Sequence, residues 1–335
     1  MSRWILTIAL LGCWDTPPPK GVDSAGDTGV WDTGSTSFEG WSLLADNVGK
    51  GVLLSAWSNG DEVIMVGGDM DGGPGVLARY DGERLCTEAN VADRALWWIH
   101  GPREGEWYAV GEAGRVVHEK DGTRERIDIP TEATLFGVWA TDTAVIAVGG
   151  YPAEGRGEIW IYQGAGSWTA LATELPDTVF KIWEEWAVGM DILYQVDAPT
   201  LISYPAMGRL LTVRGRDADD VWAVGGFTSS LVIHWDGTTW TEQDSTGVGQ
   251  PLNGVWTAPG EDVWVAGNFG TTMFFDGTDW RMPSLPITSE HFHAVWGHGD
   301  EVLWMGGNLF STSGNYGTIA RFADAPKTLE PAPCD

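Results

Sequence analysis

The chain has 335 residues, among them 46 glycines and 21 tryptophans, and a formal net charge of −28 at pH 7. So negative a protein would repel nucleic acid and anionic lipid headgroups, which argues against both as partners. The glycine and tryptophan content, with only 20% charged residues, indicates many short strands and tight turns around an aromatic core.

The first thirteen residues have the pattern of an export signal. Arg3 precedes an apolar run, Trp4 to Leu11, that is too short to span a bilayer. Leu10-Leu11-Gly12-Cys13 resembles a bacterial lipobox, and this resemblance implies that Cys13 is lipidated and becomes the mature N-terminus. The alternative is an ordinary signal peptide with a chance cysteine. We therefore expect a signal peptide over 1–13 and a lipid anchor in the bacterial cell envelope.

A tether follows at residues 14–37. This segment has three consecutive prolines and is otherwise rich in Asp, Gly, Ser and Thr. Such a composition cannot bury enough apolar surface to order itself, so a flexible coil is expected.

From residue 38 onward, one phrase of short strands recurs along the chain. Its clearest copy is DDVWAVGGFTSSLVIHWDGTTW at 219–240, which returns as EDVWVAGNFGTTMFFDGTDW at 261–280. Each copy reads as a β-branched and aromatic strand ended by glycine, a second strand, an Asp-Gly hairpin turn and a tryptophan that opens the next strand. Recurring strands of this kind predict a propeller or a solenoid.

The repeat length can be taken from the spacing of the glycines that end each Val-Gly-type strand. The marks are Gly67, Gly111, Gly149, Asp197 in the glycine's place, Gly225, Gly267 and Gly306. Their mean spacing is near 40 residues, the length of a four-stranded propeller blade. We therefore predict seven blades, with six as the alternative because the fourth unit, 179–204, lacks the Asp-Gly turn.

A tryptophan in the first strand of most units is expected to pack between neighbouring blades, where a large flat ring buries much area. These residues are Trp57, Trp98, Trp139, Trp183, Trp256 and Trp296, and the fifth unit has Arg214 instead.

The two ends of the repeat region are complementary. The seventh unit stops after its third strand, at 318–322, whereas Phe38 to Leu44 resembles a fourth strand without a blade, its Trp41 matching Trp240 and Trp280. The sequence thus predicts that this N-terminal strand completes the last blade and closes the ring, which removes exposed edges. The propeller domain would cover 38–325 and a tail 326–335.

The phrase DVWAVGG followed by HWDGTTW resembles tectonin-like and related propeller repeats of exported bacterial lipoproteins, including those of myxobacteria. The resemblance covers about 38–325 and implies an all-β propeller in an exported lipoprotein. It names no activity, because propellers host unrelated functions.

Two cysteines remain once Cys13 is assigned to lipid. Cys86 lies in the expected outer strand of blade one, and Cys334 in an extended, proline-containing tail that leaves blade seven. Ring closure makes these blades neighbours, and an exported compartment lets a disulfide persist. A Cys86–Cys334 disulfide is therefore predicted, with two unrelated thiols as the alternative.

The connections between the second and third strands vary in length and sequence, and variable loops on a rigid repeat are where binding usually resides. They carry five aromatic residues that could stack sugars or hold a peptide: Tyr151, Phe227, Phe269, Phe310 and Tyr316. Loop packing is the alternative for each. Asp69 and Asp71 partly match a Ca²⁺ loop, although a plain acidic turn explains them better.

Two further groups could have a role in the channel. His291 and His293 alternate along one inner strand and could chelate a metal, but no Cys or acidic partner accompanies them at ligand spacing. Arg209, Arg214 and Arg216 could form an anion-binding channel, or could pair with Asp217, Asp219 or Asp220.

No nucleophile elbow, phosphate loop or zinc-hydrolase motif is present in the sequence. We therefore expect a monomeric, non-catalytic module without a cofactor, which binds a glycan or an envelope protein at its loop face. The alternatives are a passive envelope assembly scaffold and, third, a propeller lyase or glycosidase.

Overall fold

The computed structural model describes residues 41–58, 60–164, 166–205, 207–245, 248–260, 262–283, 286–309 and 314–334. The predicted signal peptide, Cys13, the tether and the first three residues of the closing strand lie outside the described residues. Among those described, no helix has both the length and the apolar character needed to span a bilayer.

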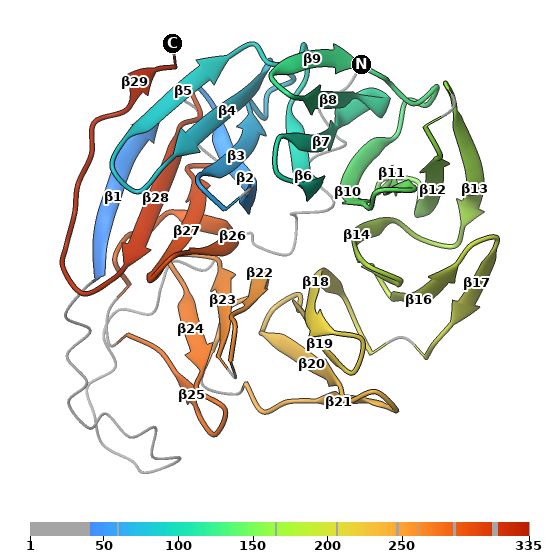
Figure 1. Ribbon diagram of the computed structural model, residues 1–335. Helices are drawn as coiled ribbons and strands as arrows, with labels where there is room; N and C mark the ends of the chain where they lie inside the picture. The colour runs from blue at the N-terminus through green and yellow to red at the C-terminus, as the bar shows by residue number, and fades with distance from the viewer. Residues whose placement is uncertain are drawn as a thin grey trace.

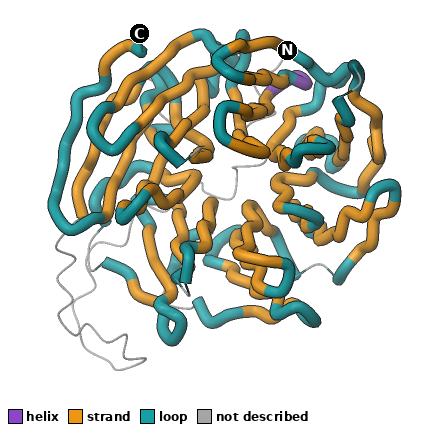
Figure 2. Tube along the Cα trace, viewed as in Figure 1, coloured by secondary structure: helices purple, strands orange, loops and turns teal. Residues whose placement is uncertain are grey.

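Seven antiparallel sheets stand around a central axis, as Figure 1 shows, and this confirms the predicted seven-bladed propeller. Nearly all of the regular structure is strand (Figure 2). In each blade the first strand is innermost, and successive strands pair outward.

The first three blades are as follows. Blade one has β2 (Val52–Ser58), β3 (Val63–Gly68), β4 (Gly75–Tyr80) and β5 (Leu85–Ala89), with β29 (Ala332–Pro333) added at its outer edge. Blade two has β6 (Leu96–Arg103), β7 (Glu106–Gly111), β8 (Val116–Lys120) and β9 (Thr123–Arg126), with the 3-10 helix η2 (Glu112–Gly114) between β7 and β8. Blade three has β10 (Thr134–Ala140), β11 (Val145–Tyr151), β12 (Arg156–Tyr162) and β13 (Trp168–Leu175).

The remaining blades follow the same order. Blade four has β14 (Val179–Trp183), β15 (Trp186–Gly189), β16 (Ile192–Asp197) and β17 (Thr200–Ser203). Blade five has β18 (Leu210–Asp217), β19 (Asp220–Gly225), β20 (Leu231–Trp235) and β21 (Trp240–Glu242). Blade six has β22 (Leu252–Thr257), β23 (Val263–Gly267), β24 (Thr272–Phe275) and β25 (Trp280–Arg281). Blade seven has β26 (His291–His298), β27 (Glu301–Gly307), β28 (Gly317–Phe322) and β1 (Trp41–Val48).

The ring closes as predicted, through the N-terminal strand. β1 pairs antiparallel with β28, and Trp41 lies opposite Phe322. Trp240 opposite Trp235 and Trp280 opposite Phe275 occupy the same place in their own blades. The first described strand of the chain therefore supplies the outer strand of the last blade.

The predicted mark of blade four at Asp197 is wrong, although the blade itself is complete. Gly189 ends its second strand, paired with Val179 as Gly225 pairs with Leu210, whereas Asp197 ends the third strand. The first hairpin of this blade is shorter than the others, and no Asp-Gly turn marks the third strand. Those two differences displaced the predicted mark by one strand.

The tryptophans of the inner strands pack between blades, with one correction. The ring of Trp57 stands where a Cβ on Gly101 of blade two would lie, and Trp256 stands in the same way over Gly297 of blade seven. In blade two, however, His100 and not Trp98 takes this position, because His100 pairs with Tyr108 as Trp57 pairs with Ile64. The His100 ring stacks on Trp139 at 3.9 Å between centroids.

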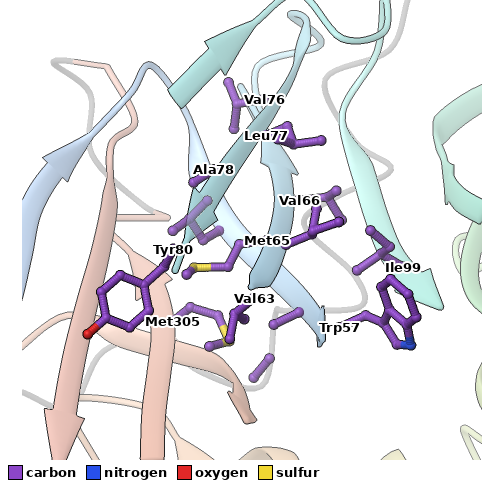
Figure 3. Packing of buried hydrophobic residues seen from close by; sticks show 14 of the residues in the cluster. Trp57, Val63, Met65, Val66, Val76, Leu77, Ala78, Tyr80, Ile99 and Met305 are labelled. Carbon is purple, nitrogen blue, oxygen red and sulfur yellow. The ribbon is translucent and has the colours of Figure 1, made fainter. Parts of the chain in front are cut away.

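Figure 3 shows the largest apolar cluster, which spans the closure. Met65 and Leu77 of blade one are fully buried, as is Met305 of blade seven. Tyr80 adds a hydrogen bond of 2.7 Å from its hydroxyl to Glu301 of blade seven. Blades seven and one are thus joined by shared apolar burial and by this hydrogen bond.

The chain ends are also tied together covalently. The tail brings β29 alongside β5 in parallel pairing, with Ala332 opposite Cys86. Cys86 and Cys334 are joined as the predicted disulfide, with 4.9 Å between their Cα atoms.

Candidate binding face and central channel

The connections of the propeller divide into two faces. We call the loop face the one that carries the connections between second and third strands and those between blades. The turn face carries the connections between first and second strands and between third and fourth strands.

The turn face uses its Asp-Gly pairs to form hairpins, as predicted. Asp236 Oδ1 accepts the backbone N–H groups of Thr238 and Thr239 at 2.9 and 2.8 Å. A hydrogen bond from the Thr238 hydroxyl adds to these and holds the pKa of Asp236 at about 2. A carboxylate that accepts three hydrogen bonds from its own turn has a structural task.

Carboxylates near the turn face also form networks that the sequence reasoning missed. Glu119 of β8 accepts hydrogen bonds from Arg79 at 2.9 Å, from Arg124 at 2.7 Å and from the Trp107 indole at 3.1 Å. Burial raises the pKa of Glu119, but the hydrogen bonds from Arg124 and Arg79 outweigh it and hold the pKa below its ordinary value. Asp220 forms a similar group with Trp222 and His234. The Glu119 network joins blades one and two through Arg79, 40 residues away in sequence, so no local motif indicated it, whereas the Asp220 network lies within one hairpin of blade five.

On the loop face, Phe227 is the one exposed ring among the described aromatic residues of the predicted platform. It lies between β19 and β20, and 53% of it is exposed. The Arg209 guanidinium carbon lies 5.3 Å from the centroid of its ring. A cation beside an exposed aromatic ring presents apolar area and hydrogen-bond donors together.

The other described aromatic residues of the predicted platform are half-buried, and each is held by its own neighbours. Arg156 covers the Tyr151 ring at 4.0 Å, and Phe269 packs against His291 at 4.6 Å. Tyr316 donates a hydrogen bond of 3.0 Å to Glu290.

These three rings and Phe227 belong to blades three, six, seven and five. In the described part of the chain no ring contact joins any two of them. Phe310 lies outside the described residues. A continuous aromatic platform is therefore not assembled among the four, and the ligand role of each residue stays a prediction.

Asp69 and Asp71 form a local turn at the same face. The Asp71 N–H donates to Asp69 Oδ1 at 3.0 Å, and the Gly73 N–H donates to the Asp69 carbonyl at 3.1 Å. Within the described ranges, no group of three or more His, Cys, Asp or Glu side chains could hold a metal ion.

Glu112, in η2 beside this turn, is a titratable group that the sequence did not single out. Burial raises its pKa to about 7; the charge of Arg94 opposes the rise and that of Asp69 adds to it. No hydrogen bond or ion pair holds its carboxylate among the described residues. A carboxyl group that titrates near neutral pH on a loop face is a candidate contact for a ligand.

The two candidate histidines differ in their hydrogen bonding. His291 Nδ1 lies 3.1 Å from Asn268 Oδ1, and burial lowers its pKa to about 4. His293 sits at a register shift between Phe292 and Ala294, and its Nε2 is buried without a hydrogen-bond partner. Burial lowers the pKa of His293 to about 3, so both rings are neutral at pH 7.

The three arginines of blade five also have different partners. Arg216 pairs with Asp220, as one alternative predicted. Arg209 lies at Phe227, and Arg214 extends instead toward Trp296 of blade seven, 4.0 Å from its ring centroid.

Within the described part of the chain, two of the best-formed surface hollows lie away from the predicted ligand-binding residues. A groove of about 550 Å³ runs between β1 and the C-terminal tail, bordered by Leu43, Asn47 and Leu329. A smaller hollow of about 90 Å³ lies between blades two and three beside Arg103 and Tyr162.

Comparison with known proteins identifies the fold class. No protein-family model and no curated protein matches the sequence. Solved structures do match: YCF48 bound to a D1 peptide has a TM-score of 0.62 at 15% identity, over 86% of this chain and 98% of that one. YCF48 from Cyanidioschyzon merolae has a TM-score of 0.62 at 15% identity, over 85% and 99%.

The WD40 β-propeller domain of Doa1 matches with a TM-score of 0.62 at 13% identity, over 84% of this chain and 97% of that one. Identities this low show the fold alone. The fold is a seven-bladed β-propeller, similar to that of the WD40 domain of Doa1.

Proposed function

We propose that this propeller is a non-catalytic binding module, exported and lipid-anchored in a bacterial cell envelope, whose loop face holds a protein or peptide. The observation that carries the proposal is Phe227, which is 53% exposed next to Arg209 on the variable face of a rigid ring. Aromatic and arginine side chains dominate the binding energy of protein interfaces. The similar propeller YCF48, bound to a D1 peptide, supports a peptide as the ligand class.

A glycan is the second candidate, because Tyr151, Phe269 and Tyr316 keep part of their surface accessible on the same face. A glycan ligand would also agree with the resemblance of the repeats to those of tectonin-like lipoproteins. The passive scaffold and the lyase or glycosidase stay as alternatives, the latter requiring paired carboxylates at the site.

Affinity capture from envelope extract tests the binding face. The wild-type protein is compared with Phe227→Ala and with Ile202→Ala, a matched control whose side chain is 44% exposed on the outer strand of blade four. We expect a partner whose enrichment falls about tenfold with Phe227→Ala, a loss of ~1.4 kcal/mol, and is unchanged with Ile202→Ala. A glycan array run in parallel assigns the ligand class. Equal capture by both variants contradicts a loop-face site and favours the scaffold.

The anchor has its own test. Cys13→Ser removes the lipid attachment site, so the variant should leave the membrane fraction while the wild-type protein stays in it. Membrane partitioning of the variant equal to that of the wild type contradicts the anchor and leaves the loop-face proposal unaffected.

A further inference from the structure

The innermost strands carry positive charge without matching negative charge. β2, β6, β10, β14, β18, β22 and β26 surround the axis of the ring (Figure 1). The chain has 47 Asp and Glu residues, yet the only one in these seven strands is the exposed Asp217 at the end of β18. In their middle they carry Lys181 and Arg214.

Arg214 crosses the central channel. It starts from β18 in blade five, and its guanidinium carbon lies 4.0 Å from the Trp296 ring centroid in blade seven. Blade six lies between these two blades, so the side chain spans the space around the axis. The indole face attracts the cation but offers no hydrogen-bond acceptor. Among the described residues Arg214 has no hydrogen bond and no ion pair, although its guanidinium has five N–H donors.

Lys181 reaches inward in a similar way. Its Nζ, from blade four, lies 2.5 Å from the Phe136 carbonyl of blade three and 4.3 Å from the Trp98 ring of blade two. Its ammonium group has three donors, and that carbonyl is its one acceptor in the described part of the chain. Burial without a carboxylate lowers the pKa of Lys181 to about 7 and that of Arg214 to about 9.

Packing alone does not account for Arg214. Trp57, Trp139, Trp183, Trp256 and Trp296 occupy the same register position in their blades. A tryptophan in blade five would extend that aromatic ring. Arginine instead places a partly buried cation in the channel, which costs solvation free energy unless a negative charge compensates it.

We propose that the central channel binds a small oxyanion, of the size of phosphate or acetate, with Arg214 as its main ligand. Lys181 supplies a second positive charge from the adjacent blade. The planar guanidinium fork can bind a phosphate or carboxylate through two parallel hydrogen bonds. Partial burial beside aromatic rings lowers the local dielectric constant and strengthens the attraction. His293 Nε2, buried and without a partner, provides a further polar atom near Lys181.

Isothermal titration calorimetry of the purified full-length chain tests this site. Sodium phosphate and sodium acetate are titrated at constant ionic strength against a sodium chloride reference. The variants are Arg214→Trp, which gives blade five the residue found in five of the other blades, Arg214→Lys and Lys181→Met. Arg281→Gln is the matched control, because it removes one positive charge from the outer strand β25, where Arg281 pairs with Asp276.

Saturable binding is expected for the wild type and for Arg281→Gln. Arg214→Trp should bind at least tenfold more weakly, and Lys181→Met and Arg214→Lys should lie in between. Which of the two anions binds more tightly distinguishes a phosphate from a carboxylate. If Arg214→Trp does not fold, the lysine and methionine variants carry the test. Binding by the wild type no stronger than to chloride overturns the proposal, as does equal binding by all variants.

Discussion

The two faces of the ring treat their polar groups differently. On the turn face Glu119 is held by two arginines and an indole, and Asp236 is held by its own turn. On the loop face Phe227 is 53% exposed and Glu112 is partly buried with a pKa near 7. The turn-face groups therefore stabilise the ring, whereas Phe227 and Glu112 on the loop face lack such partners among the described residues, as we expect of a face that binds a ligand at some cost in stability. Substitutions on the two faces should differ in sign as well as in size.

The largest expected loss is at Glu119 on the turn face. Glu119→Ala removes the acceptor shared by Arg79, Arg124 and the Trp107 indole, although Glu62 and Glu88 still pair with the two arginines, so the free energy of unfolding should fall by about 3–4 kcal/mol. Urea denaturation measures it. Glu125→Ala is the control, since the Glu125 side chain is 62% exposed and its partner is His118; we expect no more than about 0.5 kcal/mol there. A loss below about 1 kcal/mol for Glu119→Ala would show that the network contributes little.

The disulfide comes next, and it lies on the outer rim rather than on either face. Cys334→Ser opens a loop closed over 248 residues, so the free energy of unfolding should fall by about 2–4 kcal/mol. Thermal unfolding with and without reductant measures the change, and mass spectrometry of non-reduced peptides identifies the bond. Wild-type protein from the envelope with alkylatable Cys86 and Cys334 would contradict it.

A smaller loss is expected at a turn-face glycine. Gly122 has a φ of +75° and open space around its Cβ position, so Gly122→Ala costs backbone strain of about 1 kcal/mol and no clash. Gly249→Ala, in a loop-face connection with no positive φ and equally open space, is the control and should be neutral or slightly stabilising. Equal losses at both positions would remove this distinction between the faces.

Substitution of Glu112 should have the smallest effect on stability, and it should stabilise the protein where the other substitutions destabilise it. The folded-state pKa of Glu112, about 7, is above the ordinary 4.5, so the folded chain holds a proton that the unfolded chain releases between these values. Stability from this group is therefore full below about pH 4.5 and is lost as the pH rises toward 7. Glu112→Gln removes the loss, so the melting temperature should rise by a few degrees at pH 8 and hardly at pH 4.5. A variant that is less stable than the wild type at pH 8 would show that the carboxylate is satisfied.

Much of the fold could be predicted because its signals are local. The Asp-Gly turns, the buried Val-Trp-Ala-Val strands and the spare strand at Trp41 each lie in a few consecutive residues, and they specified blades, order and closure. The repeat position assigned to Asp197 was wrong because blade four lacks the Asp-Gly turn that marks the third strand. His100 was missed because the other blades led us to expect a tryptophan, and Trp98 lies only two residues before the true position.

The candidate site was less predictable, because it depends on contacts between blades. The sequence indicated which loops vary, but not that Arg156 covers Tyr151 or that Phe227 stays open. The three arginines of blade five looked equivalent in sequence, and only the ring geometry separates Arg216, paired with Asp220, from Arg214 in the channel.

Hydrogen exchange of the propeller with and without its captured partner reports which face the ligand covers, and so tests whether the loop face is the binding site. We expect slower exchange in the connections at 226–230 and 268–271 and unchanged exchange in the Asp-Gly turns at 121–122 and 236–237. Protection confined to those turns, with the loop connections unchanged, would contradict it.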